Sequence, residues 1–149
     1  AQYKLPLTIA IIDLDYFKQI NDSYGHTAGD ALLTAVVGAI FEQIRQDDTL
    51  SRFGGEEFAL ILPGTTLAAS RNLISRLKDS ISTINFKIDN DRIINITASI
   101  GVASNEADTH NFLTPLDMIK AADTALYAAK NSGRNRIIEW HPLLSSLKL

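Results

Sequence analysis

The chain has 149 residues, 46% of them hydrophobic, with a net charge of −3 and no cysteine. That length suits one compact core, so we expect a single domain over residues 1–149. The basic residues are scattered, no stretch approaches the ~18 apolar residues of a membrane span, and the lack of thiols excludes disulfides and thiolate metal sites. We therefore expect a cytoplasmic domain that contacts neither nucleic acid nor membrane, even if its parent protein is membrane-anchored.

The order of apolar patterns predicts alternating strands and helices. Residues 7–13 are apolar and β-branched without polar alternation, which is typical of a strand buried on both faces. The remaining expected elements are a short helix over 17–22, a longer helix from Thr27 or Asp30 to about Ile44, strands over 49–53 and 58–62, a helix over 67–84, a strand over 92–103, a helix from Pro115 to about Asn131 and an edge strand over 136–140. This order predicts an α/β (α+β) fold with a central mixed sheet, flanking helices and a hairpin beside the first strand.

Four carboxylates fall where the predicted strands end. Asp13 and Asp15 close the first strand, and Glu56 and Glu57 stand in the hairpin turn, so we expect them to meet at one edge of the sheet. Like charges at close range raise one another's pKa, and such a cluster usually implies a cation. All-oxygen ligands favour Mg²⁺ or Mn²⁺, which often bridge carboxylates to a substrate polyphosphate. The turn is a candidate phosphoryl-transfer site; the alternative is that the glutamates are solvated and the aspartates cap a helix.

Three ordered motifs resemble one known family. They are the runs Asp13-Leu-Asp-Tyr-Phe-Lys-Gln-Ile-Asn-Asp-Ser-Tyr-Gly-His-Thr-Ala-Gly-Asp30, Arg52-Phe-Gly-Gly-Glu-Glu-Phe58 and Tyr127-Ala-Ala-Lys-Asn-Ser-Gly-Arg-Asn135. Together they span nearly the whole chain and resemble the GGDEF-domain diguanylate cyclases, with Gly-Gly-Glu-Glu-Phe as the hairpin variant. The resemblance implies a fold related to polymerase palms and nucleotidyl cyclases. It also implies an enzyme that condenses two GTP molecules into cyclic di-GMP and two pyrophosphates across a homodimer of domains.

The resemblance implies a role for each matching residue. Two Mg²⁺ or Mn²⁺ ions per half-site would be held by Asp13, the Leu14 carbonyl, Glu56 and Glu57, and Glu56 is the candidate for helping to deprotonate the attacking 3′-hydroxyl. The residues implied to bind substrate are Phe17, Asn21, His26, Asp30, Gly54, Gly55, Lys130 and Arg134. Asn21 and Asp30 would read guanine, which needs acceptors for its N1 and N2 donors. Lys130 and Arg134 would reach the triphosphate, together with free N–H groups where the helix at Phe17 begins.

A further match lies upstream of the hairpin. Arg45-Gln-Asp-Asp48 stands at the offset from Gly54 that resembles the family's inhibitory product site, and Arg76 matches an arginine that contributes to that site from a neighbouring domain. Each of these assignments has a simpler alternative. Asn21 and Asp30 suit helix ends, His26 suits packing, Lys130 and Arg134 suit a helix C-terminus, and Arg45 with Asp48 suits a solvated surface pair.

The chain also departs from the family. Residues 1–6 lead directly into the first strand, without the helix and the Asp-x-Leu-Thr turn that usually open the domain. Two other functions stay open at this point: a noncatalytic GGDEF-like module that binds cyclic di-GMP or GTP, and a palm relative that acts on nucleic acid. The intact hairpin motif argues against the first, and the acidic charge argues against the second.

Overall fold

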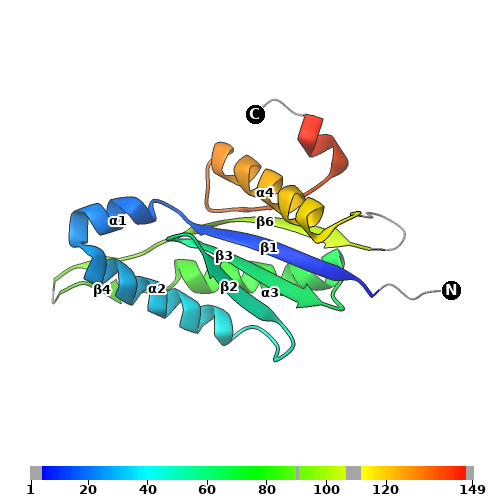
Figure 1. Cartoon of the computed structure of the whole chain (residues 1–149). Helices are drawn as coiled ribbons and strands as arrows, with labels where there is room; N and C mark the ends of the chain where they lie inside the picture. The colour runs from blue at the N-terminus through cyan, green and yellow to red at the C-terminus, as the bar shows by residue number, and fades with distance from the viewer. Residues whose placement is uncertain (1–4, 90, 107–111, 147–149) are drawn as a thin grey trace.

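The computed structural model describes residues 5–89, 91–106 and 112–146, so most of the opening segment discussed above lies outside the described residues. A five-stranded sheet lies at the centre, with the strand order β2-β3-β1-β6-β7 (Figure 1). Its strands, in chain order, are β1 (Leu7–Leu14), β2 (Thr49–Phe53), β3 (Glu57–Pro63), β6 (Ala98–Asn105) and β7 (Ile137–Glu139). β1 is antiparallel to β3 and β6, whereas β7 is parallel to β6, which confirms the predicted mixed sheet.

Four α-helices of the described residues cover both faces of the sheet. They are α1 (Phe17–Tyr24), α2 (His26–Phe41), α3 (Leu67–Ser82) and α4 (Pro115–Asn131), and a 3₁₀ helix, η1 (Pro142–Ser146), follows β7. Successive strand residues point to opposite faces, so Ala10 and Ile12 of β1 join the core cluster under α2 and α3, while Ile9 and Ile11 join the one under α4. Figure 1 shows α4 on one side of the sheet and α2 and α3 on the other. No helix in these ranges has the length and apolar composition to cross a membrane.

Glycine permits an unusually close approach of α4 to β6. A Cβ built on Gly101 would lie 2.2 Å from both the Ala122 carbonyl oxygen and the Leu126 backbone nitrogen. The helix can pack at this distance only because the strand has no side chain there. This contact fixes the height of α4 above the sheet, and with it the position of the basic residues at the end of α4.

The clearest difference from the sequence expectation lies in the strand expected over 92–103. That strand is divided into β5 (Ile93–Ile94) and β6, and β5 pairs with the short strand β4 (Phe86–Lys87) in a separate sheet. Asn95 explains the division, because its amide donates to the Ile84 carbonyl and to Asn85 Oδ1, both at 2.8 Å. Those bonds draw the chain toward the end of α3 and away from the central ladder.

Candidate active site

The end of β1 and the β2–β3 hairpin form an acidic edge of the sheet. Asp13 is the cross-strand partner of Glu57, so their side chains lie on the same face of neighbouring strands. The Leu14 N–H donates to the Glu56 carbonyl at 3.2 Å, which holds the hairpin turn beside the end of β1. Gly54 takes φ 75°, a conformation that glycine adopts without strain and that the tight turn requires. The structure thus brings Asp13, Glu56 and Glu57 together.

The electrostatics of this edge show excess negative charge. The Asp13 side chain is 8% exposed and forms an ion pair with the Lys130 ammonium group at the end of α4. The pKa of Glu57 is raised, first by burial and then by the negative charge of Asp13, while Lys130 partly offsets the rise. Burial also raises the pKa of Asp123, which lies about two turns before Lys130 in α4. A single lysine therefore does not neutralise the carboxylates that meet here, and a further cation would relieve them.

The donor set suits a divalent cation that is completed by substrate. Within the described ranges, no three Asp, Glu, His or Cys side chains converge into a metal cage. Mg²⁺ is commonly held by only one or two carboxylates, and its other ligands are waters and substrate phosphates. The partly desolvated pair of Asp13 and Glu57, with neighbouring backbone carbonyls, is a donor set of that kind.

Asp15 differs from the expectation that all four acids share one cluster. Its carboxylate accepts hydrogen bonds from the Thr97 and Ser99 hydroxyls, both at 2.6 Å, and from the Asn135 backbone N–H at 3.0 Å. These donors come from β6, its preceding turn and the α4–β7 turn, which the sequence does not place near Asp15. Ser99 is also the cross-strand partner of Asp13, so the Asp15 carboxylate lies beside the acidic edge, but its oxygens are already occupied by these three donors.

The residues expected to read guanine lie on two consecutive helices. Asn21 of α1 packs over Gly29 of α2, where an added Cβ would lie 1.7 Å from Asn21 Oδ1. That oxygen is buried and has no hydrogen-bond partner among the residues that the structure describes. A buried acceptor without a donor is costly, so it is suited to a donor from a ligand. Asp30 is exposed one residue later and borders a cavity of about 340 Å³, which Arg52 of β2 also lines.

The remaining expected substrate residues surround this edge. His26 is exposed as the first residue of α2, and Gly55 stands beside Gly54 in the hairpin turn. The Phe17 side chain is buried in the core at 3% exposure, so only its backbone at the start of α1 is available to a ligand. The Arg134 guanidinium lies 4.7 Å from the centre of the Tyr16 ring and 3.9 Å from Asp15 Oδ1.

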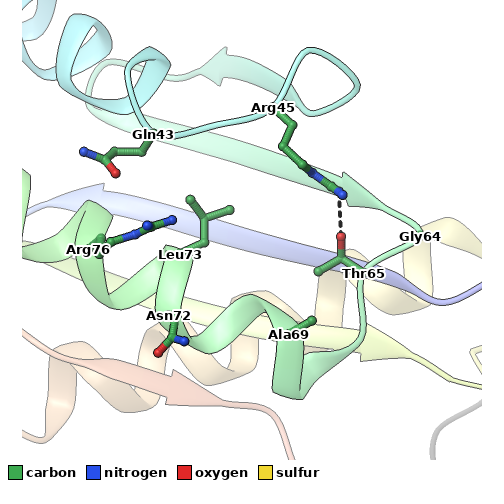
Figure 2. Close-up of a pocket in the computed structure, with 8 residues that line it drawn as sticks. All are labelled: Gln43, Arg45, Gly64, Thr65, Ala69, Asn72, Leu73 and Arg76. Atoms are coloured by element: carbon green, nitrogen blue, oxygen red, sulfur yellow. Dashed lines mark hydrogen bonds between the residues drawn. The ribbon is translucent and has the colours of Figure 1, made fainter.

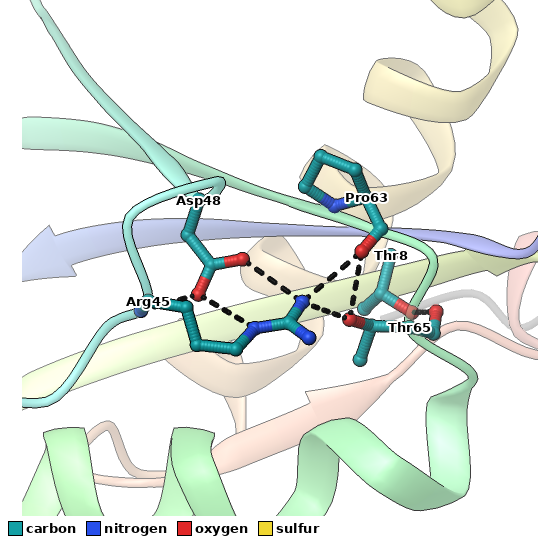
Figure 3. Close-up of polar contacts among 5 residues, drawn as sticks. All are labelled: Thr8, Arg45, Asp48, Pro63 and Thr65. Atoms are coloured by element: carbon teal, nitrogen blue, oxygen red, sulfur yellow. Dashed lines mark hydrogen bonds and ion pairs between the residues drawn. The ribbon is translucent and has the colours of Figure 1, made fainter.

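The expected product-site arginines line one cavity. Arg45 and Arg76 border a space of about 270 Å³ between the α2–β2 connection and α3, together with Gln43, Thr65 and Asn72 (Figure 2). Arg45 is fixed there because Nη2 donates to Asp48 Oδ1 at 3.1 Å, the Pro63 carbonyl at 3.1 Å and Thr65 Oγ1 at 2.8 Å (Figure 3).

Asp48 has a different place from the two arginines. Its side chain is fully buried and, besides the guanidinium, its carboxylate accepts the backbone N–H of Arg45 at 2.8 Å. In this arrangement Asp48 faces Arg45 rather than the cavity. Thr65, which the sequence analysis did not single out, also accepts a hydrogen bond from Arg45, and only the fold brings the two residues together.

Solved structures of known proteins share this fold. The active GGEEF domain of a diguanylate cyclase from Vibrio cholerae superposes with a TM-score of 0.81 at 31% identity over 91% of this chain and 83% of that one. The GGDEF domain of DgcB from Caulobacter crescentus, in complex with c-di-GMP, gives a TM-score of 0.81 at 29% identity over 90% of this chain and 77% of that one. The class defined by the fold and the acidic hairpin is therefore that of palm-like cyclase domains.

Sequence comparison gives the family. The family model described as "Diguanylate cyclase, GGDEF domain" matches residues 1–136, and the chain belongs to that family. Diguanylate cyclase DgcP of Pseudomonas aeruginosa is 41% identical over 134 residues, which make up 88% of this chain and 19% of that protein. The chain spans between 19% and 35% of the length of the curated relatives it matches.

Proposed function

We propose that this domain is the catalytic unit of a diguanylate cyclase, which condenses two GTP molecules into cyclic di-GMP and two pyrophosphates. The observation that carries the proposal is the pairing of the Asp13 and Glu57 carboxylates, with Lys130 against them, beside an intact Gly-Gly-Glu-Glu-Phe turn. Relatives named diguanylate cyclases at 40% and 41% identity support the same activity.

The reaction is two identical phosphoryl transfers. In each, the 3′-oxygen of one GTP attacks the α-phosphorus of the other, the bond to pyrophosphate breaks, and the 3′-hydroxyl gives up its proton. Two Mg²⁺ or Mn²⁺ ions per half-site, held by Asp13, the Leu14 carbonyl, Glu56 and Glu57, would supply charge neutralisation at the phosphates. Glu56 is the residue that would accept the departing proton, since it stands in the hairpin turn beside the end of β1.

Substrate recognition is divided between two sides of the acidic edge. Asn21 Oδ1 and the Asp30 carboxylate accept the N1 and N2 donors of guanine, and His26 lies beside them at the start of α2. Gly54 and Gly55 leave room for close approach to the turn. Lys130 and Arg134 pair with the triphosphate, and free N–H groups at the start of α1 near Phe17 add donors. One domain holds one GTP, so the reaction requires two domains that face each other.

We further propose that the product inhibits the enzyme at the cavity between Arg45 and Arg76. Two guanidinium groups match the charge of the two phosphates of cyclic di-GMP, and Asp48 keeps Arg45 in place. Arg76 contributes either within the domain or toward the partner domain. The complex of the Caulobacter crescentus GGDEF domain with c-di-GMP supports binding of this product by the fold.

The test is product analysis with a tethered dimer. The domain, fused to a dimeric coiled coil, is incubated with GTP and Mg²⁺, and the nucleotides are separated by chromatography. Cyclic di-GMP is the expected product, and Glu56→Gln should lower turnover at least about a hundredfold while the protein still binds GTP. Asp79→Asn, the same type of change on the exposed face of α3, is the matched control and should leave turnover unchanged. A tethered dimer that binds GTP and forms no product would refute the proposal in favour of a binding module.

A further inference from the structure

Asp15 is a buried anion that joins three separate segments. Its side chain is 1% exposed, and its carboxylate accepts the Thr97 hydroxyl, the Ser99 hydroxyl and the Asn135 N–H at 2.6, 2.6 and 3.0 Å. A carboxylate this deeply buried is stable only when its oxygens are satisfied in this way. Three donors occupy both oxygens, so any movement of the Asp15 carboxylate would break these bonds.

Backbone strain is concentrated around this carboxylate. In the described part of the chain, the non-glycine residues with positive φ are Tyr16 at 59°, Arg134 at 62° and Asn135 at 48°. Tyr16 follows Asp15 directly, Asn135 donates its N–H to Asp15, and Arg134 forms the ion pair with it. The left-handed conformation is unfavourable for a residue with a Cβ, less so for asparagine than for tyrosine or arginine, so the surrounding structure must hold these turns in place.

The two strained turns together aim the Arg134 side chain. The α4–β7 turn places the Arg134 guanidinium over the Tyr16 ring at 4.7 Å, and Lys130, four residues earlier in the chain, forms its ion pair with Asp13. The ion pair with Asp15 is long, at 3.9 Å, and the Arg134 side chain remains 34% exposed. Because a guanidinium has five N–H donors, most of them stay available to a phosphate.

We propose that Asp15 is a positioning residue for triphosphate recognition, which acts by holding the α4–β7 turn and Tyr16 so that Arg134 points to the acidic edge. This inference rests on the proposed function, since it assigns Asp15 to the binding of GTP. Asp15 does not touch the nucleotide. Its loss should therefore weaken the contacts that Arg134 makes with the phosphates and leave the contacts with guanine intact.

The test compares the binding of GTP with that of guanosine, which lacks phosphates. In the full chain with Mg²⁺, Asp15→Asn and Arg134→Ala should each weaken GTP binding by at least about tenfold and leave guanosine binding unchanged. The double variant should be no weaker than the weaker single variant, because Asp15 acts through Arg134. Asp79→Asn, the same chemical change at an exposed position of α3, should match the parent.

Three results would overturn the inference. If Asp15→Asn lost equal affinity for GTP and guanosine, Asp15 would have a general structural role. If the loss of GTP affinity in the double variant equalled the product of the two single losses, Asp15 would act independently of Arg134. If Asp15→Asn bound GTP as well as the parent does, Asp15 would have no role in recognition. If Asp15→Asn does not fold, Thr97→Val removes a single donor to the same carboxylate, and it should weaken GTP binding about threefold without affecting guanosine. A parent protein that binds neither nucleotide would refute the proposed function itself. If the parent binds GTP and Asp15→Asn binds it equally well, only this inference is refuted.

Discussion

Gly101→Ala tests whether α4 lies on β6 as closely as described. The new Cβ would meet the Ala122 oxygen and the Leu126 nitrogen at 2.2 Å and the Leu126 Cα at 2.8 Å, whereas an ordinary contact begins at 3.4 Å. All three atoms are backbone, so no side-chain rotation removes the overlap, and α4 must retreat by about 1 Å. Overpacking of this kind costs about 1–3 kcal/mol, and we expect the upper end because a whole helix must move.

The assay is thermal unfolding followed by circular dichroism. A loss of about 3 kcal/mol in a domain of this size lowers the Tm by about 6–12 °C. Gly38→Ala is the matched control, because its Cβ meets no atom within 4 Å on the exposed face of α2, and it should stabilise the fold by about 0.5–1 kcal/mol. Lys130 lies one turn beyond Leu126, so Gly101→Ala should also weaken GTP binding. A Tm equal to that of the parent would show that the close approach of α4 is wrong.

Three further predictions concern the site. Gly29→Ala should displace the Asn21 amide, because the amide oxygen lies 1.7 Å from the new Cβ, and should weaken GTP and guanosine binding equally. If the variant kept its affinity for guanosine, Asn21 would not take part in base recognition. The pKa of Glu57 is higher in the folded state than its ordinary value of 4.5, so the protonated form of Glu57 stabilises the fold at acid pH. This stabilisation is lost as the pH rises from 4.5 through the folded-state pKa. Glu57→Gln should therefore have a higher Tm than the parent at pH 7 without divalent cations and an equal Tm near pH 4, and a constant difference across this range would contradict the assigned cause. Arg45→Ala should keep full turnover but lose most inhibition by added cyclic di-GMP at saturating GTP. Equal inhibition of the parent and the variant would show that the product does not act at the Arg45 cavity.

Local sequence patterns predicted much of the fold and the acidic edge. The β-branched run of β1 and the glycines of the hairpin specify a buried strand and a tight turn by residue type alone, so the approach of Asp13 to the hairpin acids was predicted. The pairing of Asp13 with Glu57 was not, because Glu57 was expected in the turn and is the first residue of β3. The helix beginning at Pro115 was likewise predictable, because Thr114 accepts the Asp117 N–H as an N-cap and proline suits the first turn.

Long-range polar contacts decided what the sequence did not predict. Asp15 is bonded to residues 82, 84 and 120 positions away, and no local pattern distinguishes it from Asp13, which stands two residues earlier. The division of the strand at Asn95 depends in the same way on a contact with the end of α3. Thr65 is a partner of Arg45 because the fold places the β3–α3 turn beside the α2–β2 connection, which are about 20 residues apart in the chain (Figure 3).

The central claim is that two of these domains jointly convert two GTP molecules into one cyclic dinucleotide. The most direct measurement is the initial rate of cyclic di-GMP and pyrophosphate formation as a function of domain concentration, with saturating GTP and Mg²⁺, for the free chain and for the coiled-coil dimer. The account predicts two pyrophosphates for each cyclic di-GMP, a rate per chain that rises with concentration for the free domain, and a constant rate per chain for the tethered one. A rate per chain that does not depend on concentration in the free domain, or pyrophosphate released without cyclic di-GMP, would contradict it.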